Sequence, residues 1–228
     1  GKLVWRFHTV PRDPALGAQD HPDLEEAVKT WDPKSRWDIG GGGTPWDAIN
    51  YDAETGNVII GTGNGGPYHT IKRSPKGGDQ LYLGSLVALD AKTGRKKWHY
   101  QQTPGDNWDF TSTQPMILTH MKIDGTDRPV IINAPKNGFL YVIDRRGHLI
   151  GVLSMRDLIL ARPARLLRDI MIPRVVSVPA TMDQEEVAQL MHEKRYLALP
   201  VVDKDNRLVG IITADDIQDV FHEEATEE

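Results

Sequence analysis

The chain has 228 residues, of which 39% are hydrophobic, a composition typical of a globular protein with one large or two small domains. Its net charge of -5 argues against a nucleic-acid partner, and the absence of an eighteen-residue apolar run argues against a membrane segment. The lack of cysteine excludes disulfides, thiolate metal sites and a thiol nucleophile. Because Gly1 opens inside a strand-like stretch and is not an initiator Met, we expect a piece of a longer protein.

Two composition regimes meet near residue 150. All six Trp lie at or before Trp108, and 19 of the 21 Gly precede residue 151. Residues 1–150 carry 18 Lys+Arg against 17 Asp+Glu, whereas residues 151–228 carry 9 against 15. This break predicts two parts of different fold class.

In the first regime, short β-type runs alternate with Gly, Asp, Asn and Pro turns, which indicates an all-β sandwich, barrel or propeller. A recurring unit favours the propeller, because Gly1-Lys-Leu-Val-Trp5 is echoed by Gly94-Arg-Lys-Lys-Trp98. A propeller blade leaves one face uncovered until its neighbour stacks on it, and such repeats recur from blade to blade. The expected strands are 3–7, 57–61, 86–89, 96–100, 129–133 and 139–143.

Several long motifs then occur in order, namely GGGTPWDAINYD (41–52), GTGNGGPY (61–68), a stretch over 77–115 that contains GDNWDF, and APKNGFLYVIDR (134–145). Together they resemble the quinoprotein alcohol dehydrogenases, which are eight-bladed propellers that use pyrroloquinoline quinone (PQQ) and calcium. The resemblance covers nearly all of residues 1–146 and implies a partial propeller.

The resemblance assigns four site residues. Trp46 would be the floor on which the quinone stacks, and Asn64 would be a calcium ligand. Asp109 would be the ancestral catalytic base, and Lys136 would hydrogen-bond the quinone oxygens. Each has a structural alternative: a core Trp, a left-handed turn residue, a turn cap and a solvated hairpin residue, respectively.

The stretch also departs from that family. The family's acidic calcium ligand, its adjacent Cys pair and its remaining blades are absent from this sequence. Catalysis requires groups held to well under an ångström, so we expect this part to be inactive.

In the second regime, helix and strand alternate. We expect helices over 155–159 and 165–171, a strand over 175–178, a helix opened by a capping box from Thr181 to Gln184, a hairpin of 199–202 with 208–212, and a closing helix over 214–221. DRRGHLIG (144–151) aligns with DKDNRLVG (203–210), an internal repeat whose second copy is complete and whose first is truncated.

This part resembles tandem cystathionine-β-synthase (CBS) domains, and more closely the cytosolic CBS pair of MgtE-type magnesium transporters, on RDIM, DQEEVAQLM, LPVVD, GIITADDI and EEATEE. The fold class we predict is therefore mixed, with all-β partial propeller blades (1–146) followed by an α/β CBS-type module (147–228). Within it we expect a truncated first unit (139–164), a complete second unit (165–222) and an acidic tail (223–228).

The CBS resemblance implies adenine-nucleotide binding, with ATP or AMP as ligand. In the family a Ser/Thr-x-x-Asp signature places a hydroxyl near phosphate and a carboxylate on ribose, and here the two copies are Ser154 with Asp157 and Thr213 with Asp216. The structural alternative is a helix N-cap, because Ser or Thr with an acid three residues later is common there.

The MgtE resemblance also implies magnesium sensing, because clustered carboxylates suit a hydrated Mg²⁺ and repel one another without it. Binding would draw two units together as a bistable switch, whereas a solvated acidic tail is the alternative. The implied ligands are Asp183, Glu185, Asp216, Asp219, Glu224, Glu227 and Glu228.

We interpret the chain as a composite whose junction falls within 141–149, where a strand, an Asp-initiated turn and a strand serve both ancestries. The propeller stretch before it could supply edge strands to the CBS sheet. Three functions follow: regulatory binding of Mg²⁺ or adenine nucleotide, with a homodimer formed through the CBS module; a PQQ- and calcium-dependent alcohol oxidoreductase; or a recombined chain without a selected function. The resemblances imply a periplasmic location for the first part and a cytoplasmic one for the second.

Overall fold

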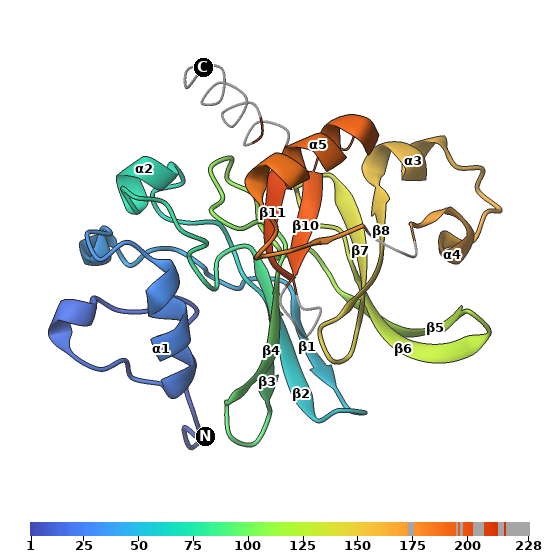
Figure 1. The fold of residues 1–228 in the computed structure, drawn as a ribbon. Helices are drawn as coiled ribbons and strands as arrows, with labels where there is room; N and C mark the ends of the chain where they lie inside the picture. Colours follow the sequence, from blue (N-terminus) through green and yellow to red (C-terminus); the bar gives the residue numbers. More distant parts are fainter. Residues whose placement is uncertain (173–175, 195, 197, 203–207, 214–216, 218–228) are drawn as a thin grey trace, which may run out of the picture.

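The computed structural model describes residues 1–172, 176–194, 196, 198–202, 208–213 and 217 (Figure 1). Its first sheet is antiparallel with strand order β1-β2-β3-β4, and these strands follow one another along the chain as in a propeller blade. We call it the first blade; its strands are β1 (Ile49–Asp52), β2 (Asn57–Gly61), β3 (Ser85–Asp90) and β4 (Lys96–Gln101).

A second antiparallel sheet repeats this order as β5-β6-β7-β8, and we call it the second blade. Its last strand comes from sequence beyond the junction and pairs with β7 from Phe139 opposite Ser154 to Ile143 opposite Leu149. The ordered hairpin predicted across the junction is therefore confirmed. The strands are β5 (Ile117–Ile123), β6 (Thr126–Asn133), β7 (Phe139–Asp144) and β8 (Leu149–Ser154).

The two blades stack through one apolar cluster. Ile59, Ala88 and Tyr100 of the first blade meet Ile131 and Tyr141 of the second, and all five are buried. Alternate residues of each strand face this cluster, as the two-residue period of a strand requires. The blades therefore share a core like that between successive repeats of a propeller.

Each Trp of the recurring motif lies on a glycine in the next unit. The Trp5 indole donates its N–H to Ala91 O at 2.9 Å and covers Gly94, where a Cβ would lie 2.7 Å from the ring. The Trp98 indole donates to Arg145 O at 2.9 Å and covers Gly147, where a Cβ would lie 2.9 Å away. The repeat seen in the sequence is thus an interlock between units.

The N-terminal segment covers the outer face of the first blade. Leu24 and Ala27 of α1 (Pro22–Ala27) pack on the buried side chains of Ile60, Val87 and Leu89. The segment also contains three short 3₁₀ helices, η1 (Pro14–Leu16), η2 (Val28–Thr30) and η3 (Trp37–Ile39), and α2 (Thr70–Arg73) lies between β2 and β3. This arrangement shields one blade face from water without another blade.

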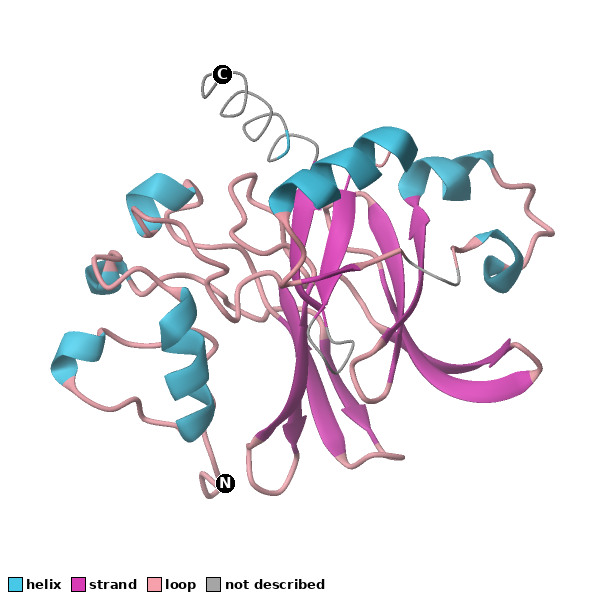
Figure 2. Ribbon diagram, in the orientation of Figure 1, coloured by secondary structure: helices cyan, strands magenta, loops and turns pink. Residues whose placement is uncertain are grey.

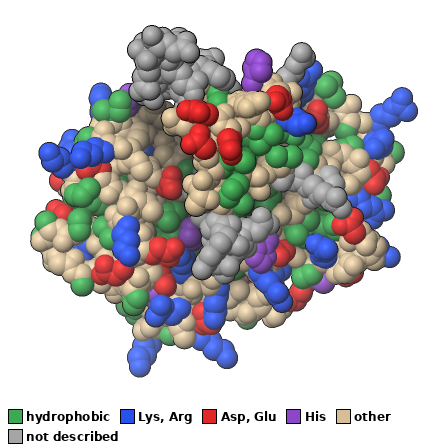
Figure 3. All heavy atoms as spheres, viewed as in Figure 1, with side chains coloured by type: hydrophobic (Ala, Val, Ile, Leu, Met, Phe, Trp, Pro, Cys, Tyr) green, Lys and Arg blue, Asp and Glu red, His purple; other side chains and the backbone are tan. Residues whose placement is uncertain are grey.

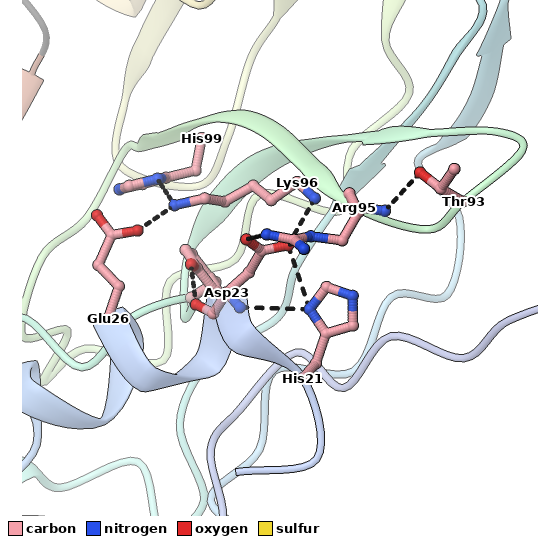
Figure 4. A network of polar contacts seen from close by, with 8 residues as sticks. His21, Asp23, Glu26, Thr93, Arg95, Lys96 and His99 are labelled. Atoms are coloured by element: carbon pink, nitrogen blue, oxygen red, sulfur yellow. Dashed lines mark hydrogen bonds and ion pairs between the residues drawn. The ribbon is translucent and has the colours of Figure 1, made fainter. Parts of the chain in front are cut away.

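A polar network fastens α1 to the β3–β4 hairpin (Figure 4). The Asp23 carboxylate accepts the Lys96 backbone N–H at 2.8 Å and pairs with Arg95 Nη2 at 3.2 Å. The Lys96 ammonium pairs with the Glu26 carboxylate at 2.5 Å. Burial would raise the pKa of the Asp23 carboxyl, but the Lys96 N–H and the Arg95 guanidinium outweigh it, so its pKa lies below its usual value.

Helices from beyond the junction cover the outer face of the second blade. Leu158 of α3 (Met155–Leu160), Leu167 of α4 (Leu167–Ile170) and Met171 pack against a cluster that includes Val130 and Val142. This cluster contains residues from both sides of the junction. The second part of the chain therefore occupies the place where a further blade would stack.

The remaining described residues form a small α/β unit with its own core. Its sheet has the order β11-β10-β9, antiparallel between β11 and β10 and parallel between β10 and β9. Val187, Ala188 and Met191 of α5 pack with Val178 and Leu199. Figure 2 shows α5 across the ends of these strands. The elements are β9 (Val178–Pro179), α5 (Gln184–Lys194), β10 (Ala198–Val202) and β11 (Leu208–Thr213).

A buried ion pair joins the blades at the junction turn. Arg145 Nη1 lies 2.7 Å from Asp52 Oδ1, and Arg145 Nε donates to Val130 O. Burial alone would raise the pKa of the Asp52 carboxyl, yet hydrogen bonds from Thr55 and Arg145 hold its pKa below the usual value. The junction turn is thus tied to both blades.

The mixed fold class is confirmed, with two partial propeller blades and an α/β unit. Four sequence expectations about single elements were wrong. Of the described residues in the strand expected over 175–178, only Val178 lies in a strand, β9. Residues 3–7 are not a strand, α5 begins at Gln184 with Asp183 accepting the Glu185 N–H rather than at Thr181, and the helix expected over 165–171 spans only α4. The propeller stretch adds no strand to the sheet of β9, β10 and β11; instead, β8 completes the second blade. The expected closing helix falls almost wholly outside the described residues.

The Trp98–Gly147 contact can be tested by adding one methyl group. Gly147 and Gly138 have φ of +92° and +84°, so alanine at either position costs about 1–2 kcal/mol for the left-handed backbone. Only Gly147→Ala also meets an indole, and we expect about 1–3 kcal/mol of further destabilisation. Urea unfolding measures both; equal losses for Gly147→Ala and Gly138→Ala would contradict the interlock.

The apolar cluster on the second blade predicts that a residue beyond the junction stabilises the blades. Met171→Ala removes a buried side chain and should cost about 2–5 kcal/mol, whereas Ile172→Ala, at an exposed neighbour, should cost less than about 0.5 kcal/mol. Because every Trp precedes residue 109, Trp fluorescence reports unfolding of the blades. A Trp-detected transition that Met171→Ala leaves unmoved would show that the helices do not support the blade.

Candidate functional site

A pocket of about 340 Å³ lies where loops of both blades meet. The first blade contributes residues just before β1 and just after β2, and the second contributes residues before β5 and between β6 and β7. Because these loops leave the same end of both sheets, side chains distant in sequence converge there. The lining residues are Trp46, Asp47, Asn64, Asp109, Thr111, Thr113, Gln114, Pro115 and Lys136.

Trp46 presents an indole face to this pocket. Its side chain is 57% exposed, so it is not the core residue that the structural alternative required. Its ring rests on Gly63, where a Cβ would lie 2.6 Å from Cζ3, so only glycine admits the indole there. A flat aromatic surface supported in this way can stack on a planar ligand.

Asn64 lies in a loop that packs closely on the glycine run before Trp46. Its carbonyl accepts the Gly43 N–H at 2.9 Å, and a Cβ on Gly42 would lie 2.4 Å from the same oxygen. Its side-chain Nδ2 donates to Gly65 O at 3.0 Å. The glycines therefore permit a close backbone approach that fixes Asn64 at the pocket edge.

Asp109 and Lys136 meet across the second half of the pocket. Asp109 Oδ2 lies 3.4 Å from Lys136 Nζ, and both side chains are about half exposed. Asp109 also has φ of +62°, in the left-handed region that a non-glycine residue seldom occupies. Of the four residues implied by the first resemblance, all four line this one pocket.

The buried Asp106 carboxylate shapes the Asp109 loop. It accepts the Trp108 N–H at 3.1 Å and the Phe110 N–H at 3.1 Å, so both neighbours of Asp109 are held by one side chain. Burial raises the pKa of Asp106, while those N–H groups and the Arg73 charge oppose the rise. Sequence analysis missed this residue, although an Asp two positions before the Trp of Trp-Asp is the pattern of a side-chain-capped turn.

The buried Arg73 guanidinium also contacts the loop that carries Asp106 and Asp109. It donates to Asp106 O at 2.8 Å, to Tyr68 O at 2.8 Å and to Gln80 Oε1 at 2.6 Å. Burial lowers the pKa of Arg73, and the Asp106 charge opposes that change. Gly65 is needed beside it, because a Cβ there would lie 2.2 Å from Arg73 Cζ.

The first of the two proposed nucleotide signatures forms a helix cap in this structure. Ser154 Oγ accepts the Asp157 N–H at 3.1 Å and lies 2.6 Å from Asp157 Oδ2. Its role in nucleotide binding stays a prediction. Of the second signature, the Thr213 side chain and Asp216 lie outside what the structure describes.

The two described magnesium candidates lie at the start of α5. Asp183 and Glu185 are exposed, and Asp183 Oδ1 accepts the Glu185 N–H at 2.9 Å. Within the described ranges, no three His, Cys, Asp or Glu side chains are grouped so as to hold a metal ion. The other candidates fall outside the described residues; they are Asp216, Asp219, Glu224, Glu227 and Glu228.

Comparison with protein families assigns the two parts. Residues 1–149 match the model described as "Glucose/ethanol/alcohol dehydrogenase, beta-propeller domain" of the PQQ proteins, which is more than half of the chain. The chain belongs to this PQQ dehydrogenase propeller family. Residues 167–223 match the CBS domain model.

Individual relatives agree with the first assignment. The quinohemoprotein alcohol dehydrogenase of Comamonas testosteroni is 56% identical over 146 residues, which cover 64% of this chain and 20% of that protein. The dehydrogenase subunit of alcohol dehydrogenase (quinone) from Komagataeibacter europaeus is 47% identical over 150 residues, again 64% of this chain and 20% of that protein. The chain thus spans about a fifth of the length of the curated relatives it matches.

A solved structure agrees with the assignment of the first part. The crystal structure of the Comamonas testosteroni enzyme has a TM-score of 0.64 and 54% identity, covering 66% of this chain and 23% of that one. The soluble part of a magnesium transporter aligns at 48% identity over 39% of this chain and 34% of that chain, with a TM-score of 0.36. The chain is therefore a PQQ-dehydrogenase propeller fragment fused to a CBS domain.

The pocket can be compared with the groups that this family implies. Trp46 over Gly63 suits a flat quinone, and Lys136 supplies a donor for its oxygens, so the residues present fit part of a quinone site. Calcium takes six to eight oxygen ligands, and the side-chain oxygens that line this pocket belong to Asp47, Asn64, Asp109, Thr111, Thr113 and Gln114, of which Asp109 is paired with Lys136. The calcium role of Asn64 therefore stays a prediction. In the described part of the chain, no helix is long and apolar enough to cross a membrane.

The buried Asp106 predicts an acid-dependent change in stability. Folding raises the pKa of the Asp106 carboxyl, so its ionised form destabilises the folded protein. This loss of stability disappears as pH falls through the folded-state pKa towards the unfolded value near 3.8. Asp106→Asn keeps an acceptor oxygen but does not titrate. We therefore expect the stability of the wild type relative to Asp106→Asn to increase from pH 7 to pH 4 in urea unfolding; a constant or decreasing difference would contradict the raised pKa.

Proposed function

We propose that the chain is a ligand-binding regulatory protein whose CBS part binds Mg²⁺ or an adenine nucleotide. The observation that carries the proposal is that β9, α5, β10 and β11 form an α/β unit with its own buried core. A unit that retains its core can hold surface carboxylates in a defined arrangement. The match of residues 167–223 to the CBS family supports the same reading.

The position of the acidic residues supports Mg²⁺ as one ligand. Asp183 and Glu185 lie exposed at the start of α5, and the sequence over 215–228 carries seven carboxylates and no Lys or Arg. Mg²⁺ keeps several waters and binds through few carboxylates, so it tolerates such a loosely grouped set. Neutralising these charges would relieve their mutual repulsion.

In this proposal the dehydrogenase part is a scaffold without alcohol-oxidising activity. The N-terminal segment covers one outer blade face, and α3 and α4 cover the other. Among the described residues, neither outer face is left bare for a further copy to stack on and complete a ring. Completion of the quinone site by oligomerisation, which the sequence left open, is disfavoured for this steric reason.

Quinone binding without turnover is a second candidate. The observation that favours it is the convergence of Trp46, Asn64, Asp109 and Lys136 on one pocket. PQQ supplies electron-accepting chemistry when bound in enzymes of this family. In this chain Trp46 would stack on such a ligand and Lys136 would donate to its oxygens.

A thermal-shift series with Mg²⁺, ATP, and PQQ with calcium separates these functions. At a hundredfold excess over the dissociation constant, a ligand adds about 2.7 kcal/mol, which raises Tm by roughly 5–11 °C in a protein of this size. We expect Mg²⁺ or ATP to give this shift. Glu185→Gln should reduce the Mg²⁺ shift, and Glu193→Gln, in the last turn of the same helix, should preserve it.

Each outcome decides between the candidates. Failure of both Mg²⁺ and ATP to move Tm would overturn regulatory binding by the CBS part. A shift with PQQ, accompanied by quenching of Trp fluorescence, would support the second candidate. Dye-linked alcohol oxidation would overturn the scaffold assignment.

A further inference from the structure

Residues 155–169, which we call the α3–α4 surface, have two chemically different sides. Leu158 and Leu167 point inward and pack on the second blade. On the outside, Ile159 is 74% exposed, Leu160 is 71% exposed and Leu166 is 51% exposed. Three long aliphatic side chains thus project into water from a segment whose inner side is already used.

The same segment carries four exposed arginines, Arg156, Arg162, Arg165 and Arg168. Arg168 Nε lies 3.7 Å from Asp169 Oδ1, and Arg165 Nη2 donates to Asp169 O at 3.2 Å. The other acid of the segment, Asp157, is hydrogen-bonded to Ser154. This surface is therefore locally positive although the whole chain carries a net charge of -5. Figure 3 shows Lys and Arg side chains along the edge of the molecule where α3 and α4 lie.

We propose that the α3–α4 surface docks on an anionic lipid surface. Interfacial binding combines apolar side chains that enter the headgroup boundary with arginines that pair with lipid phosphates. Arginine stems can lie along the apolar boundary while their guanidinium groups stay in the polar layer. Side chains that protrude, as Ile159 and Leu160 do, suit insertion into a soft layer more than a fit into a rigid groove.

Two other occupants fit this surface less well. A second copy docked through the same surface would bring four arginines against four, because a two-fold interface juxtaposes the same patch on both subunits. A single-stranded nucleic acid would lack stacking partners, since residues 155–169 contain no aromatic side chain. An anionic lipid surface satisfies both the charge and the exposed aliphatic groups.

Sedimentation with lipid vesicles tests the proposal on the full chain. We expect binding to vesicles containing roughly a third phosphatidylglycerol, weak binding to pure phosphatidylcholine, and release by salt. We expect Arg162→Glu with Arg165→Glu to weaken vesicle binding at least about thirtyfold, because each arginine removed lowers the affinity on the order of fivefold. Ile159→Ser with Leu160→Ser should also weaken it, and because these side chains are exposed the fold should be retained. Circular dichroism checks that fold.

The matched control is Lys29→Glu with Lys72→Glu, which reverses two exposed charges on η2 and α2. The proposal holds if this control binds vesicles like the wild type apart from the small effect of net charge. Equal loss in the control and the arginine variant would overturn it, as would equal binding to both vesicle types. Binding to polyglutamate without vesicle binding, or a change of oligomeric state in light scattering with Ile159→Ser and Leu160→Ser, would instead assign the surface to a protein partner.

Discussion

The stacking of an indole on a bare backbone glycine is the constraint on which this structure depends. Trp98 can lie against the junction turn only because Gly147 has no Cβ, and its N–H then reaches Arg145 O. Trp5 repeats the contact one unit earlier on Gly94. Gly147 lies within residues 1–149, which match the propeller family, so residues of that part alone form the interlock between the blades. The same turn carries Arg145, which pairs with Asp52 of the first blade.

The outer face of each blade must also be covered. A propeller blade in isolation exposes apolar side chains on both faces, and a closed ring solves this by repetition. Here the first blade is covered by the N-terminal segment and the second by α3 and α4. α3 lies between the two family matches and α4 within the CBS match, so helices stand where a further blade would stack. Their only requirement is an apolar side of suitable size, which explains how the packing can be satisfied without a shared ancestry.

The sequence predicted the local features well and the long-range ones poorly. The β7–β8 hairpin followed from two apolar runs around an Asp-initiated turn, all within sixteen residues. The strand expected at 3–7 failed because a strand needs a hydrogen-bonded neighbour, and no described strand pairs with it. Trp46, Asn64, Asp109 and Lys136 were found through family motifs, whereas Asp106 and Arg73 escaped because burial and carbonyl contacts leave no periodic signal.

The pocket depends on the stacking of the two blades. Its residues come from loops at one end of two stacked blades, so the blade-to-blade core alone is enough to gather them. In the described part of the chain, helices pack on the outer faces of both blades. Binding tolerates an open side, whereas catalysis needs exclusion of water and groups held to well under an ångström. An exposed indole and a lysine gathered at one pocket meet the first requirement, and on this we base the proposal of quinone binding without turnover.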